Sequence, residues 1–340
     1  NFIKIFSYNI FIFFLLIIFF EVFFGYFFKK NNFGYIMRSE RQKNQIYEVI
    51  HNNIKYRYKY KRNFYGFRGE EIDPSEIKIV FEGGSTGNQK FTPEELIIVG
   101  LLNKKLNDFN KDFKIINAST DGKTTRGYVN DFIHWFSKLK NFNPEYVIFY
   151  TGINDSNLLQ PRKFDIPWRE DRLSKFRDYL KNNSKSYELI KKFQFNFFLE
   201  NNIRKEYRVT KINENLYKNY EYINYKKASE IHKNYNDVKL INQFAERLET
   251  LKYYIAKLNV TPIFITQIEY NGLNNNKLYV INEYLKKFCK ENGYSIIKLD
   301  ELINNLEINS FYDYMHTTPK GSITIANKIY PELIKILNIN

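Results

Sequence analysis

Short, nearly continuous apolar runs recur along most of the chain, and they constrain its fold more than any other feature. Each run has four or five residues and little alternation between apolar and polar side chains. Such runs are typical of strands buried on both faces, as in a parallel sheet. They occupy residues 77–81, 113–116, 146–150, 262–266 and 295–299.

Helical patterns separate these runs. Thr92, Pro93 and Glu95 offer an N-cap, a proline at the first helical position and a capping-box carboxylate, and apolar residues at helical spacing follow them. The other predicted helices cover 128–139, 238–258, 277–291 and 319–337. Alternation of strands and helices in this way predicts a doubly wound α/β sheet.

Residues 5–28 form a 24-residue stretch that is almost wholly apolar, although it contains Glu21 and a few other polar or small residues. About 20 apolar residues span the hydrocarbon core of a bilayer. A cleaved signal peptide would end in small residues at a cleavage site, whereas residues 23–30 read FFGYFFKK. The sequence therefore predicts an uncleaved transmembrane anchor at 1–30.

The rest of the chain divides into two unequal parts. Residues 31–73 are polar, basic and aromatic, and we interpret them as a linker and lead-in segment to an α/β domain at 74–340. Within that domain, residues 158–235 have no strand rhythm and are rich in Lys, Asn and Tyr. This tract is too long for an ordinary loop, so a largely helical insertion is predicted, with a disordered tract as the alternative.

The chain is strongly basic, with 52 Lys and Arg against 37 Asp and Glu and a net charge of +15. Such a charge can indicate a nucleic-acid or anionic-membrane partner. However, the chain is also rich in Asn, Ile and Phe, and a low-GC genome produces this bias without selection for binding. No nucleic-acid recognition motif is present, so no nucleic-acid partner is expected. The single cysteine, Cys289, excludes a disulfide framework and a cysteine-rich zinc module.

The first apolar run leads into the motif EGGSTG at 82–87, in which glycines surround Ser85. Glycines permit a tight turn and a close approach of a ligand, and the N–H groups that follow can hold an oxyanion. A dinucleotide fingerprint is excluded, because it would need glycine in place of Glu82. Three readings stay open: a G-x-S-x-G nucleophile elbow, a serine nucleophile on the first strand of a flavodoxin-like sheet, and a turn without chemistry.

A serine hydroxyl needs a base at neutral pH, and His316 is the best placed of the four histidines. It stands three residues after Asp313, just before the last predicted helix. This spacing lets the carboxylate reach the imidazole, fix its tautomer through Nδ1 and leave Nε2 for Ser85. A surface pair at a helix start is the alternative. No catalytic role is expected of the other histidines, which are His51, His134 and His232.

Two polar blocks complete the pattern. Gly122 follows the second apolar run and Asn154 follows the third. Because open α/β sheets carry their sites at the carboxyl ends of the strands, both residues are expected near Ser85. A glycine N–H and an asparagine amide, with the N–H of Ser85, would give an oxyanion three donors. Asp155, next to Asn154, is predicted to be structural.

Four sequence blocks occur in the order found in the SGNH (GDSL-type) hydrolase family, and the chain resembles that family. The blocks contain Ser85, Gly122, Asn154 and the pair Asp313 and His316. The resemblance covers about 77–337 apart from the insertion, and NFYGFRG at 63–69 looks like the lead-in of membrane-anchored members. Gly84 departs from the family pattern, because the family's namesake aspartate stands at that position. The resemblance implies a flavodoxin-like three-layer α/β/α fold with a five-stranded parallel sheet, preceded by one transmembrane helix. It disfavours the nucleophile elbow, whose acid usually lies well upstream of its histidine.

The resemblance also implies an activity and a site. Ser85 would attack an ester carbonyl, His316 would carry the proton and Asp313 would orient the histidine. The oxyanion hole would be Ser85, Gly122 and Asn154, and no metal or organic cofactor would be needed. The substrate would be an acyl ester, with an acylated cell-envelope carbohydrate as the first choice. The alternatives are an O-acyltransferase that uses the same residues and a catalytically inactive, membrane-tethered binding protein.

Two indications about the membrane side disagree. Basic residues just after the apolar stretch, such as Lys29 and Lys30, favour a cytoplasmic domain. The family resemblance instead implies a single-pass anchor with an extracytoplasmic domain. We prefer the extracytoplasmic placement, because the local charges stand on a uniformly basic background.

Overall fold

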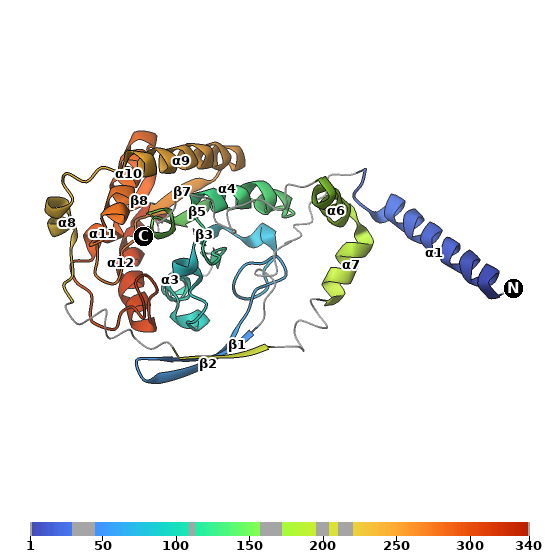
Figure 1. Ribbon diagram of the computed structural model, residues 1–340, viewed down its shortest axis with the longest axis horizontal. Helices are drawn as coiled ribbons and strands as arrows, with labels where there is room; N and C mark the ends of the chain where they lie inside the picture. The colour runs from blue at the N-terminus through green and yellow to red at the C-terminus, as the bar shows by residue number, and fades with distance from the viewer. Residues whose placement is uncertain are drawn as a thin grey trace.

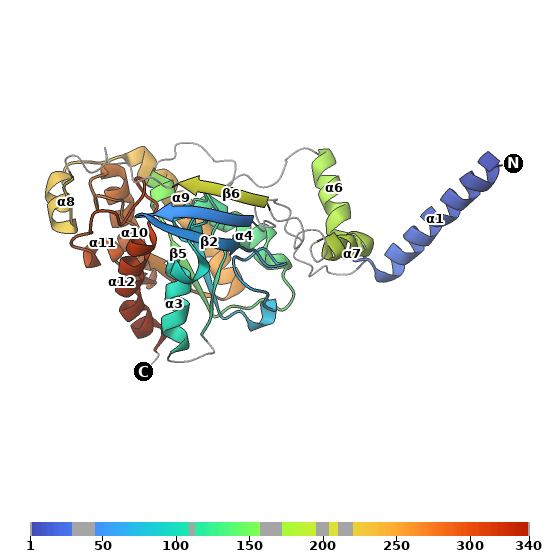
Figure 2. The same ribbon diagram turned by 90° about the horizontal axis from the view of Figure 1, so that it is seen from below.

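The computed structural model describes residues 2–28, 45–108, 113–156, 172–194, 204–209 and 220–338. These residues form an α/β domain, a small second sheet beside it, and a long N-terminal helix that extends away from both (Figure 1). Two helices, α6 (Arg172–Asn183) and α7 (Lys185–Gln194), lie between the N-terminal helix and the α/β domain (Figures 1 and 2).

Among the described residues, five parallel strands form the central sheet in the order β4-β3-β5-β7-β8. This is the flavodoxin-like order, so the prediction of a doubly wound, five-stranded parallel sheet is confirmed. The strand ends differ from the predicted apolar runs by at most two residues. The strands are β3 (Ile79–Gly83), β4 (Ile115–Asn117), β5 (Tyr146–Tyr150), β7 (Thr261–Ile265) and β8 (Ser295–Ile297).

Alternate residues of each strand contribute to cores on opposite faces of the sheet. Ile79 and Phe81 belong to the core that includes α3 (Ile98–Asn107) and α12 (Pro319–Leu337), which lie side by side in both views (Figures 1 and 2). Val80 belongs to the opposite core. That core includes residues of α4 (Thr125–His134), α9 (Val238–Leu258) and α10 (Asn276–Asn292). The three-layer arrangement explains why the strands are continuously apolar, since neither face meets water.

Helix α3 begins later than the sequence pattern predicts. A 3-10 turn, η3 (Glu94–Leu96), occupies the predicted first turn, and α3 begins at Ile98. The side-chain oxygen of Gln89 accepts the Ile98 N–H at 2.8 Å. The predicted Thr92 cap is wrong, because the N-cap of η3 is Pro93 and no side chain caps that turn. Gln89, which lies outside the predicted capping motif, satisfies the first N–H of α3.

The remaining helices agree closely with the pattern. Helix α9 has the predicted bounds, α10 extends the predicted helix by one residue at each end, and the helix predicted at 128–139 is α4 followed by a 3-10 turn. The short helices are η2 (Pro74–Glu76), α2 (Ser85–Asn88), η4 (Phe136–Lys138), α5 (Ile153–Ser156), α8 (Tyr225–Ile231) and α11 (Leu299–Leu302).

Part of the predicted linker forms a β-hairpin. Strands β1 (Gln45–His51) and β2 (Ile54–Tyr60) pair antiparallel. The two residues between them, Asn52 and Asn53, both have positive φ, as the favoured two-residue hairpin turns require. Strand β6 (Arg204–Val209) pairs parallel to β1. This strand falls in the tract predicted to be largely helical, whose other described elements are α6, α7 and α8.

Helix α1 (Phe2–Phe24) contains most of the apolar stretch. Residues Ile3–Phe24 are long and apolar enough to cross a membrane, and the other described residues do not bury them. A signal sequence near an N-terminus can meet the same criteria of length and apolarity, so α1 is a candidate span.

Candidate active site

Ser85 begins α2 at the carboxyl end of β3, where a parallel sheet presents its functional groups. The preceding residue, Gly84, is the N-cap of α2. A Cβ at Gly84 would overlap the Asn154 amide nitrogen and would lie 3.1 Å from the Lys123 carbonyl oxygen. Glycine at this position therefore allows the serine turn and the Asn154 side chain to approach each other closely.

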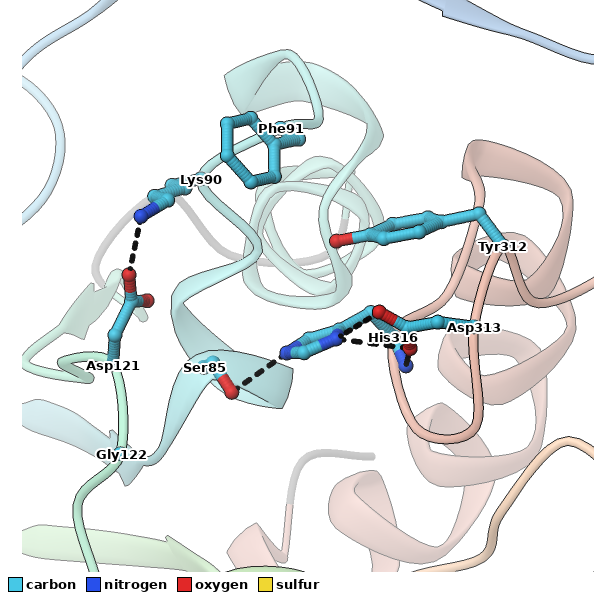
Figure 3. A pocket seen from close by; sticks show the side chains of 8 residues that line it. All are labelled: Ser85, Lys90, Phe91, Asp121, Gly122, Tyr312, Asp313 and His316. Atoms are coloured by element: carbon cyan, nitrogen blue, oxygen red, sulfur yellow. Dashed lines mark hydrogen bonds and ion pairs between the residues drawn. The ribbon is translucent and has the colours of Figure 1, made fainter. Parts of the chain in front are cut away.

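The structure brings His316 between Ser85 and Asp313, although 231 residues separate the serine from the histidine. His316 Nε2 lies 2.7 Å from Ser85 Oγ (Figure 3). On the other side of the ring, Nδ1 lies 2.7 Å from Asp313 Oδ2 and 3.0 Å from Oδ1. These distances give the serine a base within hydrogen-bond reach and give the base a carboxylate that orients it.

Asp313 is held as a carboxylate by its own turn. Its Oδ1 accepts the backbone N–H groups of Met315 at 3.0 Å and His316 at 2.8 Å. Burial alone would raise the pKa of Asp313, but the bond and charge of His316 and these two N–H groups outweigh it and lower the pKa below its usual value. The acid is thus ionised at neutral pH, as an orienting carboxylate must be.

Tyr312 covers one face of the His316 ring. The two rings are stacked, with centroids 5.6 Å apart and planes 9° from parallel. The Tyr312 backbone N–H also donates to the His316 carbonyl at 3.0 Å, which closes the loop between them. The imidazole is therefore restrained by its neighbouring ring as well as by the carboxylate.

The two predicted oxyanion donors outside the serine turn also lie at this edge of the sheet. Gly122 has φ +74°, a conformation that favours glycine, and it lines the same cavity as Ser85. Asn154 lies on α5, directly after β5, and its amide nitrogen donates to the Lys123 carbonyl at 2.8 Å. The structure thus brings Ser85, Gly122 and Asn154 together around one turn.

Gln89 joins the serine turn to the loop that carries His316. It is buried and has φ 44° at the end of α2. Its amide nitrogen donates to Thr317 Oγ1 and to Ser322 Oγ, each at 2.6 Å. The sequence did not indicate this residue, because no motif includes it and its contacts with Thr317 and Ser322 are made only in the folded chain.

Gln267 makes a comparable link to the Asn154 turn. Its amide nitrogen donates to Thr86 Oγ1 at 2.9 Å, and its amide oxygen accepts the Ile153 N–H at 2.7 Å. It follows β7, so it reaches both turns from the neighbouring strand of the sheet. Sequence reasoning missed this residue as well.

Two arginines of the predicted lead-in segment hold the end of α2. Arg62 Nη2 donates to the Asn88 side-chain oxygen at 2.8 Å and to the Ser119 carbonyl at 2.7 Å. Arg68 donates to the Asn88 carbonyl. Both arginines are buried, and the Asn88 amide nitrogen in turn donates to Asp121 at 2.7 Å. Residues before 74 therefore help to build the wall of the site.

A buried ion cluster lies beneath the loop that contains Gly122. Lys123 Nζ lies 2.7 Å from Glu82 Oε2 and 2.5 Å from Asp131 Oδ2, and it also donates to the Ala118 carbonyl at 2.9 Å. The Lys123 side chain is only 1% exposed. A buried charge is tolerated only when it is paired and hydrogen-bonded, so this cluster joins β3, α4 and the Gly122 loop.

Asp155 makes the structural contacts that its position suggested. Its carboxylate accepts the Thr125 hydroxyl at 2.7 Å and the Thr151 hydroxyl at 3.2 Å. It also pairs with Arg247 Nη2 at 3.2 Å, which connects the start of α4 to α9.

Two of the three histidines outside the motif lie against backbone carbonyls away from the serine. His51 Nε2 lies 2.6 Å from the Phe91 carbonyl, and His232 Nε2 lies 3.0 Å from the Leu273 carbonyl. Burial lowers the pKa of His51, which the carbonyl contact only partly offsets. Neither ring is among the residues that line the cavity beside Ser85.

No family model matches the sequence, and no curated protein matches it. Solved structures do match the chain.

The structure titled TesA is 11% identical with a TM-score of 0.44, and the match covers 76% of this chain and 99% of that one. A catalytic mutant of Axe2, an acetylxylan esterase from Geobacillus stearothermophilus, is 12% identical with a TM-score of 0.43, covering 76% of this chain and 94% of that one. The acetyl xylan esterase AlAXEase is 14% identical with a TM-score of 0.42, covering 76% of this chain and all of that one. These TM-scores lie below 0.5, so the matches carry no argument about the chemistry of the site. That chemistry is inferred from the residues of this chain.

A cavity of about 290 Å³ lies beside Ser85 and His316. Figure 3 shows Tyr312 on one side of it and the Lys90–Asp121 ion pair, 2.8 Å long, on the other. Burial would raise the pKa of Asp121, but the Lys90 charge and the Asn88 amide outweigh it and hold the pKa below its usual value. The cavity thus presents an aromatic ring and two opposite charges next to the serine.

The described residues contain no group of three or more His, Cys, Asp or Glu side chains that could hold a metal ion. Cys289 is buried, and burial raises the pKa of its thiol to about 12. A thiol with that pKa is not a thiolate at neutral pH, so Cys289 is not a competing nucleophile.

Proposed function

We propose that this chain is a membrane-anchored serine esterase of the SGNH type, which hydrolyses an acyl ester. The observation that carries the proposal is the pair of short contacts made by His316, 2.7 Å to Ser85 Oγ and 2.7 Å to Asp313 Oδ2. Triads of this kind are recognised by geometry and role rather than by sequence position.

In the first step, Ser85 Oγ attacks the ester carbonyl carbon while His316 Nε2 accepts the hydroxyl proton. His316 then donates this proton to the leaving alcohol as its bond to the carbonyl carbon breaks, which leaves an acyl-enzyme. Asp313 keeps the imidazole in the tautomer whose Nε2 can accept a proton, and it stabilises the imidazolium.

In the second step, water attacks the acyl carbon and gives its proton to His316 Nε2. The bond between the acyl carbon and Ser85 Oγ then breaks, the serine oxygen takes the proton back, and the carboxylic acid leaves. An acyltransferase would use a sugar hydroxyl in place of water at this step, with the same residues.

The oxyanion of each tetrahedral intermediate is assigned to the N–H groups of Ser85 and Gly122 and to the Asn154 amide. Ser85 supports this assignment because it begins a helix, where the first N–H groups have no intrahelical partner. Gly122 lines the same cavity, and the Asn154 amide nitrogen lies against Gly84. Loss of one such donor typically lowers kcat by about 10²–10³-fold.

An acylated carbohydrate is the proposed substrate class. The cavity combines the rings of Phe91 and Tyr312 with the charged pair of Lys90 and Asp121. Aromatic faces can stack on sugar rings and charged groups can bond hydroxyl groups, so this lining suits a polar alcohol better than a long alkyl chain.

Helix α1 supports the anchor. Its 22 residues at Ile3–Phe24 have a mean hydropathy of 2.3, enough length and apolarity for a bilayer core. We place the α/β domain outside the cytoplasm, where a cell-envelope carbohydrate would be accessible. A C-terminal reporter that is active only outside the cytoplasm tests this placement, and activity of a cytoplasmic reporter instead would reverse it.

The esterase proposal is tested by replacing the nucleophile. The full chain is purified in detergent and assayed with p-nitrophenyl acetate beside Ser85→Ala. We expect Ser85→Ala to lose at least about 10³-fold in kcat, because the acyl-enzyme cannot form.

The matched control is Ser229→Ala, which removes an exposed hydroxyl on α8 and is expected to keep full activity. Equal rates for Ser85→Ala and the unchanged chain would exclude the esterase. Adding a sugar acceptor separates the two enzyme classes, since a transferase would make acylated sugar faster than free acetate.

A further inference from the structure

Helix α7 is attached to α1 through Glu21, the acidic residue of the apolar helix. The Glu21 carboxylate accepts the N–H groups of Lys185 at 2.8 Å and Ser186 at 2.9 Å, and the Ser184 hydroxyl at 2.7 Å. These N–H groups belong to the first turn of α7, which has no intrahelical acceptors for them. Glu21 therefore supplies the negative charge that a helix N-terminus favours.

A second set of contacts closes the same junction. The Tyr26 N–H donates to the Asn183 carbonyl at 2.7 Å, and its hydroxyl donates to Glu188 Oε2 at 2.9 Å. Lys185 Nζ pairs with the same Glu188 oxygen at 2.9 Å. The Glu188 side chain is only 4% exposed. Polar contacts thus join the end of α6 and the start of α7 to the carboxyl end of α1. Figure 2 shows α7 beside that end of α1.

Both helices carry large apolar side chains that are exposed to solvent. The spacing places each set on one helical face. The exposed fractions range from 40% to 82%. The residues are Leu173, Phe176 and Leu180 on α6, and Leu189, Ile190 and Phe193 on α7.

The same two helices are basic. Over Arg172–Asn183 and Lys185–Gln194 the sequence has seven Lys and Arg against two Asp and Glu. An apolar face combined with an excess of Lys and Arg is the composition of helices that lie in the interface of a membrane. Anionic lipid headgroups attract such segments when they adjoin a transmembrane helix.

We propose that α6 and α7 lie on the surface of the bilayer that holds α1, with their apolar faces inserted at the boundary between headgroups and acyl chains. Continuity with α1 carries this choice of partner, because the Glu21 and Tyr26 contacts hold α7 at the end of the span. The excess positive charge favours anionic lipid. The two helices would then set the height and tilt of the α/β domain above the membrane. This proposal rests on the anchor and not on the esterase activity.

Fluorescent probes on the full chain in vesicles test the proposal. Single cysteines at Phe193 and, in a second variant, at Leu189 carry an environment-sensitive label, and buried Cys289 does not compete for it. The matched control is Tyr253→Cys on α9, whose side chain is 62% exposed on the α/β domain. A third position, Phe13→Cys in α1, reports insertion of the anchor. The vesicles contain phosphatidylcholine and phosphatidylglycerol, with or without lipids that carry a spin label just below the headgroup.

We expect the spin-labelled lipids to quench the probes at Phe193 and Leu189 and to leave the probe at Tyr253 bright. Replacing phosphatidylglycerol with neutral lipid should weaken the quenching at Phe193 and Leu189. Quenching at Phe13 without quenching at either helix position would overturn the proposal while the anchor stands. The probes at Phe193 and Leu189 could instead be shielded to a degree that rises with the protein-to-lipid ratio and does not depend on the spin label. In that case a second copy of the chain covers the face, and this result also overturns the proposal.

Discussion

Gln89 connects the segments that carry Ser85 and His316, which the proposed reaction needs at a constant separation. It follows the helix that begins at Ser85, and its amide nitrogen bonds Thr317, the residue after His316, at 2.6 Å. The amide oxygen of the same side chain receives the first N–H of α3. Gln89 is therefore a positioning residue, because it acts through the backbone segments on both sides of the Ser85–His316 contact.

Gln89→Ala is expected to lower kcat by about 10- to 100-fold with little change in KM, because a small displacement of reacting groups slows the chemical step. Steady-state kinetics with p-nitrophenyl acetate measure both constants. The matched control is Asn103→Ala, which removes the bonds of another amide to Ile115 at 2.7 and 2.9 Å. That control should lower the melting temperature without changing kcat. If both variants lose kcat to the same extent, Gln89 has only a general structural role.

Asp313 makes the stability depend on pH in a defined direction. Its pKa is lower in the folded chain than its usual value, so its ionised form stabilises the fold above about pH 4. This contribution is lost as the pH falls through the folded pKa. Asp313→Asn should therefore lower the melting temperature near neutral pH. The difference in melting temperature between the two chains should shrink as the pH falls below about 4. Thermal unfolding of both chains across this range measures the difference, and a gap that does not shrink would contradict the assigned contacts.

At the scale of elements, the buried ammonium of Lys123 holds the loop between β4 and α4 against β3. Its partners come from two different elements, Glu82 from β3 and Asp131 from α4. The Asn154 amide donates to the backbone carbonyl of the same lysine, so the cluster also contacts this predicted oxyanion donor. The Lys123 charge therefore links the contacts of β3 and α4 to the position of the Gly122 loop.

Lys123→Met is expected to destabilise the fold by about 3–5 kcal/mol, because it leaves two carboxylates in the interior without their cation. The triple variant that adds Glu82→Gln and Asp131→Asn should recover most of this loss, since it removes the buried charges together. Denaturant midpoints of the detergent-solubilised chains measure both effects. A triple variant no more stable than the single one would show that packing, rather than charge, is what Lys123 supplies.

At the scale of the whole molecule, the cavity depends on a segment that precedes the predicted domain boundary at 74. Arg62 and Arg68 are buried against α2, and His51 bonds the Phe91 carbonyl next to the cavity. The described contacts of the cavity residues do not include α1. The hairpin and lead-in should therefore belong to the folding unit, whereas the membrane helix should not.

Two truncations test this division. A chain that starts at residue 45 should keep the proposed esterase activity and lose the transmembrane anchor, so that an alkaline wash releases it from membranes and any binding that remains depends on α6 and α7. A chain that starts at 74 should be unstable or inactive, because Asn88 loses its two arginine partners. Full activity of the shorter chain would support the boundary at 74.

The sequence by itself determined the sheet, most of the helices and the order of the four site blocks. Each of these depends on a local pattern: a run of apolar residues, a helical period, or a polar motif at the end of a strand. Because parallel strands place their carboxyl ends at one edge, local motifs in the right order were enough to predict that Ser85, Gly122, Asn154 and His316 lie close together.

Only the tertiary structure decided what supports that site. The contact of Gln89 with Thr317 spans 228 residues, and the contact of Lys123 with Glu82 spans 41. The pairing of β6 with β1 and the attachment of α7 to Glu21 also join segments that are far apart in the sequence. A polar side chain in isolation can bond many partners, and folding selects one of them by bringing distant segments into contact. Local periodicity carries no information about that choice, so the residues that hold the site could not be read from the sequence alone.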